Sequence, residues 1–284
     1  IYGTIPQIKK GKGYNFNING INFKKEFDIL SDCIDNDHKH HEYLDKDDSH
    51  KPLCRYSDIA TYNYNNVKIN TSSTYINASW IDIPTPRNII CTQGPLPNTI
   101  DDFWTMVEQY NVNIIVMLCN IIECNSKKCE NYWNIDGKKN YMKKFKITNL
   151  KEVKFDNGII LRELMLVNVE TRNQKQVKQL HFIGWTDKGV PNINEAYGAF
   201  LNMINYIETK KGNTPLVVHC SAGVGRTGTF IAIYILYKEI MNQIRDPRRN
   251  SISFSVFNIV RKMKEMRLYL VQNLQQYCFI YYFI

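Results

Sequence analysis

The chain has 284 residues, of which 44% are hydrophobic and 22% are charged, as in an ordinary globular protein. Its net charge is +9, but the basic residues are scattered, with only short clusters at 127–128 and 245–249. This pattern argues against direct binding to nucleic acid. No apolar run approaches the roughly 18 residues that span a bilayer, so we expect no membrane segment.

The cysteines give information about the cellular compartment. There are eight of them, mostly inside apolar runs, with no C-x-x-C pair and no secretory signal ahead of them. These features predict reduced thiols in a cytoplasmic protein, with neither disulfides nor a zinc site.

Residues 1–50 form a polar extension. Within it, 21–30 has helical spacing, with Phe23, Phe27 and Leu30 on one face. The charged stretch 35–50 contains four histidines without ligand-like spacing, so we expect a solvated loop. No linker or repeat follows, and we therefore expect one domain over 1–284, with its core at 51–284.

The remaining chain alternates between strand and helix patterns. Strands are expected at 113–118, 145–150, 159–169, 179–185 and 215–220. Helices are expected at 99–110, with Thr99 as N-cap, and at 194–210, 227–244, 255–266 and about 273–283. This order predicts an α/β (α+β) fold, with a twisted mixed sheet flanked by helices on both sides.

The stretch "LVVHCSAGVGRTGTF" at 216–230 carries two overlapping motifs. Read from its glycines it is G-x-G-x-x-G, a pattern of dinucleotide-binding loops. Read from its cysteine it is Cys220, five residues, then Arg226. A dinucleotide fold needs this unit early and a buried strand after the helix. The unit here starts at residue 216, and 242–253 is not a convincing buried strand, so the cysteine reading is preferred.

In that reading the strand ends at a nucleophilic thiolate. The loop N–H groups and the helix N-terminus stabilise the thiolate of Cys220 and cradle an anion. Arg226 supplies a planar fork for two phosphate oxygens. Gly223 and Gly225 let the backbone close on the phosphate. Thr227 is expected to donate its hydroxyl to the sulfur.

Several ordered blocks extend this motif over about 51–280. "VHCSAGVGRTGTF" resembles the signature loop of tyrosine-specific, cysteine-dependent protein tyrosine phosphatases. Further blocks resemble that family in the family's order: "YINASWI" (75–81), "TQGPLPNT" (92–99), "DFW" (102–104), "KCENYW" (128–133) and "WTDKGVP" (185–191). The resemblance implies a non-receptor type catalytic domain that needs no metal or organic cofactor.

The resemblance also implies roles for residues outside the loop. Asp187 matches the general acid, which protonates the leaving phenolate and later acts as base. Trp185 borders the segment that carries it. Thr186 stands where the family has Pro, which puts closure of that segment in question. Gln272 would orient the attacking water, and Gln276 would support it.

The family also places residues around the substrate and behind the loop. Tyr56 matches the tyrosine that walls a deep cleft, and Asp58 matches the aspartate that accepts N–H groups of the substrate peptide. Glu123 would pair with Arg226, Lys128 would approach the Asp187 segment, and His219 would tune the thiolate. The loop residues implied in phosphate binding are Ser221, Ala222, Gly223, Val224 and Gly225.

The expected activity is hydrolysis of phosphotyrosine in proteins by a monomer. Departures from the family pattern at Cys54, Thr186, Asn273 and Lys264 motivate an alternative, a catalytically weakened phosphotyrosine-binding protein. A dual-specificity phosphatase is a second alternative, disfavoured by "CRYSDI" (54–59). The Asn-, Ile- and Lys-rich composition resembles the phosphatases of bracoviruses of parasitoid wasps, which implies interference with host signalling.

Overall fold

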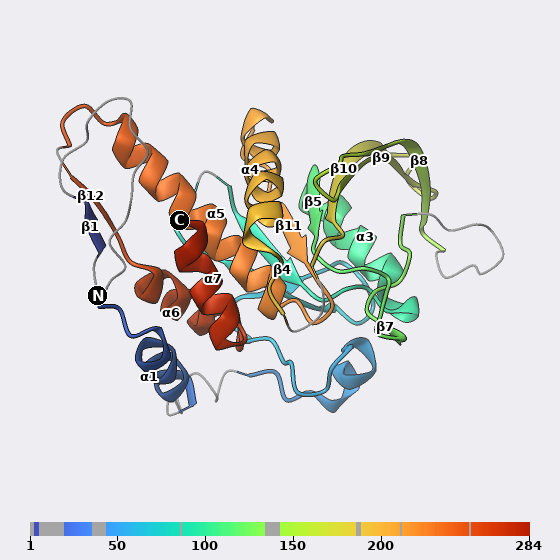
Figure 1. The fold of residues 1–284 in the computed structure, drawn as a ribbon. Coiled ribbons are helices and arrows are strands. Elements are labelled where there is room, and N and C mark those ends of the chain that lie inside the picture. The colour runs from blue at the N-terminus through green and yellow to red at the C-terminus, as the bar shows by residue number, and fades with distance from the viewer. Residues whose placement is uncertain are drawn as a thin grey trace.

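A computed structural model describes residues 3–5, 20–35, 44–85, 87–133, 143–185, 189–210, 212–249 and 251–284 (Figure 1). The helices are α1 (Phe23–Asp35), η1 (Asp48–Leu53), η2 (Pro97–Thr99), α3 (Ile100–Gln109), α4 (Ile193–Thr209), α5 (Gly225–Arg245), α6 (Val256–Met266) and α7 (Leu274–Phe283). The strands are β1 (Gly3–Ile5), β2 (Asn66–Lys68), β3 (Tyr75–Ile81), β4 (Ile89–Thr92), β5 (Ile114–Met117), β6 (Ile122–Glu123), β7 (Ser126–Lys127), β8 (Phe145–Lys154), β9 (Ile159–Asn168), β10 (Gln174–Phe182), β11 (Leu216–His219) and β12 (Ile252–Phe254).

The main sheet has eight strands within the described ranges, in the order β2-β3-β4-β11-β5-β10-β9-β8. The central strands β4, β11, β5 and β10 are parallel, and the outer pairings are antiparallel. All four residues of β11 are buried because helices and neighbouring strands cover both of its faces, which explains its apolar sequence. The strand directs its carboxyl end into the loop that begins at Cys220.

Helix α5 is the central helix of the fold. Most of its side chains are buried, and it packs against α6, α7 and β12. Helix α1, near the start of the chain, lies against α6 and α7, the last two helices (Figure 1). The mixed, twisted sheet flanked by helices confirms the predicted fold class.

Several predicted elements match and some differ. The helix expected at 21–30 is α1, and the one at 99–110 is α3. However, the Thr99 hydroxyl does not cap α3, because it accepts a hydrogen bond from the N–H of Leu96 at 2.9 Å instead. Strand β8 continues past the predicted 145–150, and β10 begins before the predicted 179–185 but ends at Phe182, since charged positions weaken the apolar pattern in the added parts.

The largest difference lies after α5. Ile252 and Phe254 are buried in β12, in a region that lacks a convincing strand pattern. β12 pairs with β1 in a separate two-stranded sheet, so it is not the second strand of a dinucleotide unit. β1 itself was also not expected. Among the described residues, no helix is long and apolar enough to cross a membrane.

Candidate active site

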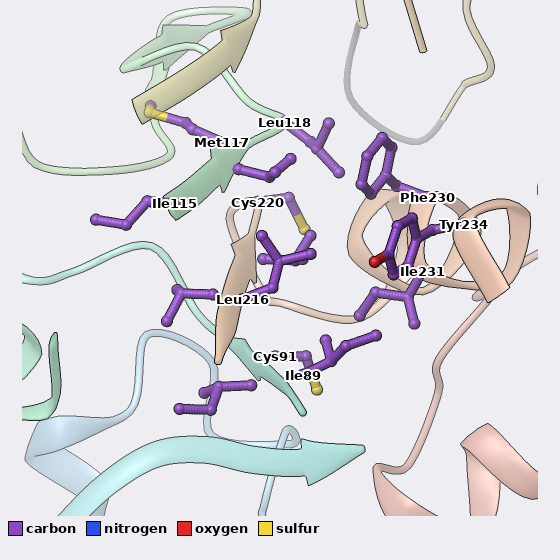
Figure 2. Close-up of a cluster of buried hydrophobic side chains, with 14 of the residues drawn as sticks. Ile89, Cys91, Ile115, Met117, Leu118, Leu216, Cys220, Phe230, Ile231 and Tyr234 are labelled. Atoms are coloured by element: carbon purple, nitrogen blue, oxygen red, sulfur yellow. The ribbon is translucent and has the colours of Figure 1, made fainter. Parts of the chain in front are cut away.

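The loop between β11 and α5 forms the bottom of the site. Cys220 follows β11 directly, and α5 begins five residues later at Gly225. Figure 2 shows the Cys220 side chain beside apolar residues of β4, β5 and α5. Gly223 has φ +71°, and a Cβ there would lie 2.2 Å from the carbonyl oxygen of Thr92. Only glycine therefore allows the loop to pass this close to β4.

The backbone N–H groups of this loop are available to an anion. The N–H groups of residues 222–225 donate no hydrogen bond to any residue that the structure describes. Ala222 and Gly225 line the same cavity as Cys220. Buried N–H groups without a partner are costly, and a loop that ends in a helix N-terminus is suited to a phosphate group.

Arg226 lies on the first turn of α5, and its guanidinium is held in one orientation. Nη1 donates to Glu123 Oε1 at 2.7 Å and Nη2 donates to Glu123 Oε2 at 3.1 Å. Nη1 also donates to the carbonyl oxygen of Trp185 at 3.0 Å. Burial works against the charge, but Cys220 and Glu123 outweigh it, so the pKa of Arg226 is raised. The structure confirms the predicted pair with Glu123.

His219 is buried and neutral beneath the loop. Burial lowers its pKa to about 4, and the cations Arg55 and Arg226 act in the same direction. Its Nε2 lies 2.7 Å from the hydroxyl of Tyr132, and its Nδ1 lies 3.1 Å from the carbonyl oxygen of Cys220. A neutral imidazole has one donor and one acceptor, so its neighbours decide which nitrogen carries the proton.

The carbonyl oxygen of Cys220 determines this tautomer, because it can only accept a hydrogen bond and therefore requires a proton on His219 Nδ1. Arg162 can only donate, and its Nη1 donates to Gln179 Oε1 at 2.8 Å. The Gln179 amide nitrogen therefore donates to the Tyr132 hydroxyl at 2.8 Å, and that hydroxyl donates to the unprotonated Nε2 of His219. His219 then carries its proton on Nδ1 and donates it to the Cys220 carbonyl. The imidazole thus holds the carbonyl group of Cys220 in place.

Arg267 supports the loop from below and is fully buried. Its guanidinium donates to the carbonyl oxygens of Gly223 at 2.9 Å and Ala222 at 3.1 Å. It also donates to Asn77 Oδ1 at 2.6 Å and Ser79 Oγ at 3.2 Å, both on β3. These bonds turn the loop carbonyls away from the cavity, so that its N–H groups can face it.

A cavity of about 220 Å³ opens above the loop. Ten of the predicted site residues line it, namely Tyr56, Asp58, Lys128, Cys220, Ser221, Ala222, Gly225, Arg226, Gln272 and Gln276. Tyr56 is half-buried, and its hydroxyl lies 2.9 Å from Ser221 Oγ. Asp58 is exposed at the rim. Asp187 and Thr186 lie outside the described residues.

Arg55, which the sequence did not single out, anchors the segment that carries Tyr56, the wall of the cavity. Its backbone N–H donates to Gln93 Oε1 at 2.8 Å, and its guanidinium donates to the carbonyl oxygens of Gly94 and Pro95. The wall at Tyr56 is therefore held against the segment that follows β4.

The segment 272–276 borders the other side of the loop. The side chain of Gln276 is buried, and its Oε1 accepts from the backbone N–H of Gln272 at 2.9 Å. Asn273 caps α7, because its Oδ1 accepts from the N–H of Gln276 at 2.9 Å. A Cβ on Gly225 would lie 2.9 Å from Gln276 Nε2 and 3.2 Å from Gln272 Oε1, so both glutamines touch the loop.

Comparison with known proteins identifies the family. The description "Protein-tyrosine phosphatase" belongs to the family model that matches residues 50–284. This chain belongs to the protein tyrosine phosphatase family.

Its relatives are named tyrosine-protein phosphatases. The chain is 33% identical to rat tyrosine-protein phosphatase non-receptor type 20, over 91% of this chain and 60% of that protein. It is 35% identical to human receptor-type tyrosine-protein phosphatase H, over 80% of this chain but 20% of that protein. The chain thus spans a fifth to three fifths of the length of these two relatives.

The solved structures include PTPN18 in complex with HER2 phosphopeptides. That chain is 30% identical to this one, with a TM-score of 0.81, over 94% of this chain and 93% of that chain. The catalytic domain of human protein tyrosine phosphatase non-receptor type 18 is also 30% identical, with a TM-score of 0.79. The phosphatase fold therefore extends over most of the chain.

Three departures from the family pattern are accommodated in this chain. Cys54 Sγ accepts from the amide nitrogen of Asn77 at 3.3 Å and lies 3.4 Å from the hydroxyl of Tyr75. Lys264 is buried and donates to the carbonyl oxygen of Val271 at 3.2 Å. Asn273 provides the α7 cap.

The role predicted for Thr227, to donate to the Cys220 sulfur as it leaves phosphorus, stays a prediction. The hydroxyl of Thr227 is buried and makes no hydrogen bond to any described residue, so the bond to the Cys220 sulfur is not formed in this structure. Trp185 is buried as well, and its Nε1 donates to the carbonyl oxygen of Gly189 at 2.9 Å. That bond ties together the two ends of the segment containing Asp187.

The sequence did not reveal a buried cluster beneath the loop. Ligand atoms of Cys119, Cys129 and His219 lie within 4.8 Å of one another. Both ring nitrogens of His219 already contact protein groups, the Tyr132 hydroxyl and the Cys220 carbonyl. Burial raises the pKa of Cys119 well above its usual value, so this thiol is protonated. His219 ends β11 whereas Cys119 and Cys129 lie outside helices and strands, and no spacing rule connects the three residues.

Proposed function

We propose that this protein hydrolyses phosphotyrosine in other proteins through a cysteinyl-phosphate intermediate. The observation that carries the proposal is the cavity at the end of β11. It combines Cys220, loop N–H groups without a partner among the described residues, and Arg226 oriented by Glu123. This set binds a dianion beside a nucleophile and stabilises the charge that develops on its oxygens.

In the first step, the Cys220 thiolate attacks phosphorus. The sulfur–phosphorus bond forms as the bond from phosphorus to the phenolic oxygen breaks. Asp187 gives its proton to that oxygen, because a free phenolate, with a conjugate acid pKa of about 10, is a poor leaving group. The role of Asp187 rests on the resemblance of "WTDKGVP" to the family block.

In the second step, water attacks the cysteinyl-phosphate. Gln272 and Gln276 hold the water beside the loop, and Asp187 accepts its proton. Phosphate leaves and the Cys220 thiolate is regenerated, so the cycle is ping-pong. The contact of both glutamines with Gly225 supports this assignment.

Selectivity for phosphotyrosine is assigned to the wall of the cavity. Tyr56 would stack against the substrate ring, and exposed Asp58 would accept backbone N–H groups of the substrate protein. A relative, PTPN18, has been solved with phosphopeptides, which supports this class of partner.

Turnover of an aryl phosphate tests the proposal. Cys220→Ser should lower kcat by more than about 10³-fold, because a serine hydroxyl is not ionised at neutral pH. Asp187→Ala should slow turnover but retain binding of phosphotyrosine peptides. If the wild-type protein binds such peptides without any turnover, the alternative, a phosphotyrosine-binding protein, is correct.

Narrower features complete the proposal. We assign 1–284 to one catalytic domain that acts as a monomer in the cytoplasm without binding nucleic acid. Because its Asn-, Ile- and Lys-rich composition resembles that of the bracovirus phosphatases, we further propose a viral protein that lowers tyrosine phosphorylation in host insect cells, including immune cells. Expression in insect blood cells should reduce total phosphotyrosine, and Cys220→Ser should abolish that effect.

A further inference from the structure

Helix α1 precedes the residues that match the family, yet it packs beside the catalytic segment. The family match begins at residue 50, whereas α1 ends at Asp35. The helix lies against α6 and α7 (Figure 1). Its Phe23 ring lies 4.9 Å from the ring of Tyr281, and its Phe27 ring lies 5.7 Å from that of Tyr277. The apolar face of α1 thus covers α7.

Glu26 lies in the centre of this contact and is 2% exposed. Its Oε2 accepts the hydroxyl protons of Tyr277 and Tyr281, each at 2.7 Å. Its Oε1 has no hydrogen-bond partner among the described residues. Burying a carboxyl group with one unpaired oxygen costs free energy, and an apolar side chain would cover α7 at lower cost. The carboxyl group therefore does more than cover the helix.

Tyr277 connects Glu26 to the catalytic glutamines. It follows Gln276 directly, and Gln276 Oε1 holds the backbone N–H of Gln272. Burial, followed by the bonds to Tyr281 and Glu26, raises the pKa of Tyr277, so its hydroxyl remains a donor. Anchoring this hydroxyl fixes the first turn of α7 and, with it, the place of both glutamines beside Gly225.

We infer that Glu26 is a positioning residue for the second half of the reaction, acting through Tyr277 on Gln276 and Gln272. This inference rests on the proposed function. In the affected step, the oxygen of water bonds to phosphorus, the sulfur–phosphorus bond breaks, and the water proton passes to Asp187. The first half, attack by Cys220, does not use the glutamines and is independent of α1.

This separation gives the inference a specific kinetic signature. Loss of Glu26 should leave kcat/KM for an aryl phosphate unchanged, because that ratio ends with release of the phenol. Water would lose its advantage over other acceptors of the phosphoryl group. In the presence of glycerol, the ratio of glycerol phosphate to inorganic phosphate should rise about three- to tenfold, as expected for the loss of one or two hydrogen bonds.

The variants separate positioning from stability. Glu26→Ala removes the acceptor, whereas Glu26→Gln keeps an oxygen for both hydroxyls and should restore the wild-type ratio. Tyr277→Phe removes one hydroxyl while keeping the buried ring, so it provides the test if Glu26→Ala does not fold. Tyr282→Phe is the matched control, because Tyr282 lies on the same helix and is 59% exposed. Its product ratio should equal that of the wild type.

Gln272→Ala is measured in parallel. If it raises the glycerol phosphate ratio while Glu26→Ala and Tyr277→Phe do not, the inference about α1 is overturned and the proposed function stands. If Gln272→Ala leaves the ratio unchanged, the glutamine mechanism and the inference fail together. A fall in kcat/KM for Glu26→Ala without a change in the product ratio would reduce α1 to a structural role and would also overturn the inference.

Discussion

The bottom and the wall of the catalytic cavity are built in opposite ways. The bottom, defined as His219–Arg226 with its supports Glu123 and Arg267, is almost entirely buried and densely hydrogen-bonded. The wall, Tyr56–Asp58, is half-buried to exposed. Groups that stabilise a transition state must be oriented before the substrate arrives, and their burial strengthens their electrostatic effect. A recognition surface must stay open until the substrate covers it.

The largest effect is expected where the orientation of the bottom is disturbed. Arg226→Lys keeps the positive charge but cannot form the two parallel bonds to Glu123. We expect kcat/KM for a phosphotyrosine peptide to fall about 10²- to 10³-fold, the usual cost of losing a preorganised donor. Arg248→Lys, at an exposed arginine, should have no effect. Activity within tenfold of the wild type would show that charge alone suffices at position 226.

Arg267, which supports the loop from below, should contribute to the stability of the fold. Arg267→Met leaves the carbonyl oxygens of Ala222 and Gly223 without their buried donor. We expect the free energy of unfolding to fall by about 3 kcal/mol in urea titrations. Arg261→Met, which removes an exposed ion pair with Glu265, should cost no more than about 0.5 kcal/mol. If both variants lost the same free energy of unfolding, the buried arginine would contribute no more to stability than the exposed one, and the prediction would be wrong.

The neutral state of His219 predicts a pH dependence of stability. Its pKa is about 4 in the folded protein, because of burial, and about 6.5 in the unfolded chain. The unfolded state thus takes up the proton first as the pH falls, so stability is lost between about pH 6.5 and 4. Between pH 7.5 and 5, this one group should cost about 2 kcal/mol.

Comparing urea unfolding of the wild type and His219→Asn over this pH range isolates the histidine. Burial raises the pKa of Asp102 to about 6, which acts in the opposite direction, but Asp102 is common to both proteins. The variant should lose less stability than the wild type. If both proteins lost the same stability over this pH range, His219 would bind its proton equally well in the folded and unfolded states, which would contradict the prediction.

The smallest effect is expected at the wall. Asp58→Asn removes the charge that would accept N–H groups of a peptide substrate, while the bottom is untouched. KM for a phosphotyrosine peptide should rise about five- to tenfold with kcat unchanged. Asp48→Asn, an exposed acid in η1, serves as control. A fall in kcat would show that wall and bottom are not separate.

The sequence predicted best those features that depend on neighbouring residues. The strand at 215–220, the following loop and the long helix were read from an apolar run, glycines and helical spacing. The Glu123–Arg226 pair was predicted from the resemblance of the ordered sequence blocks to those of the family. In contrast, β12 was missed because its partner β1 lies about 250 residues earlier in the chain.

Local sequence is enough to place a cysteine, five residues and an arginine between a strand and a helix, because short-range backbone geometry holds them together. The groups that surround this motif depend on long-range packing. Tyr132 donates to the buried ring of His219, Arg267 holds the loop, and Glu26 reaches α7 from the first helix. These contacts join residues far apart in the chain, and such contacts exist only once the whole sheet and its helices have assembled.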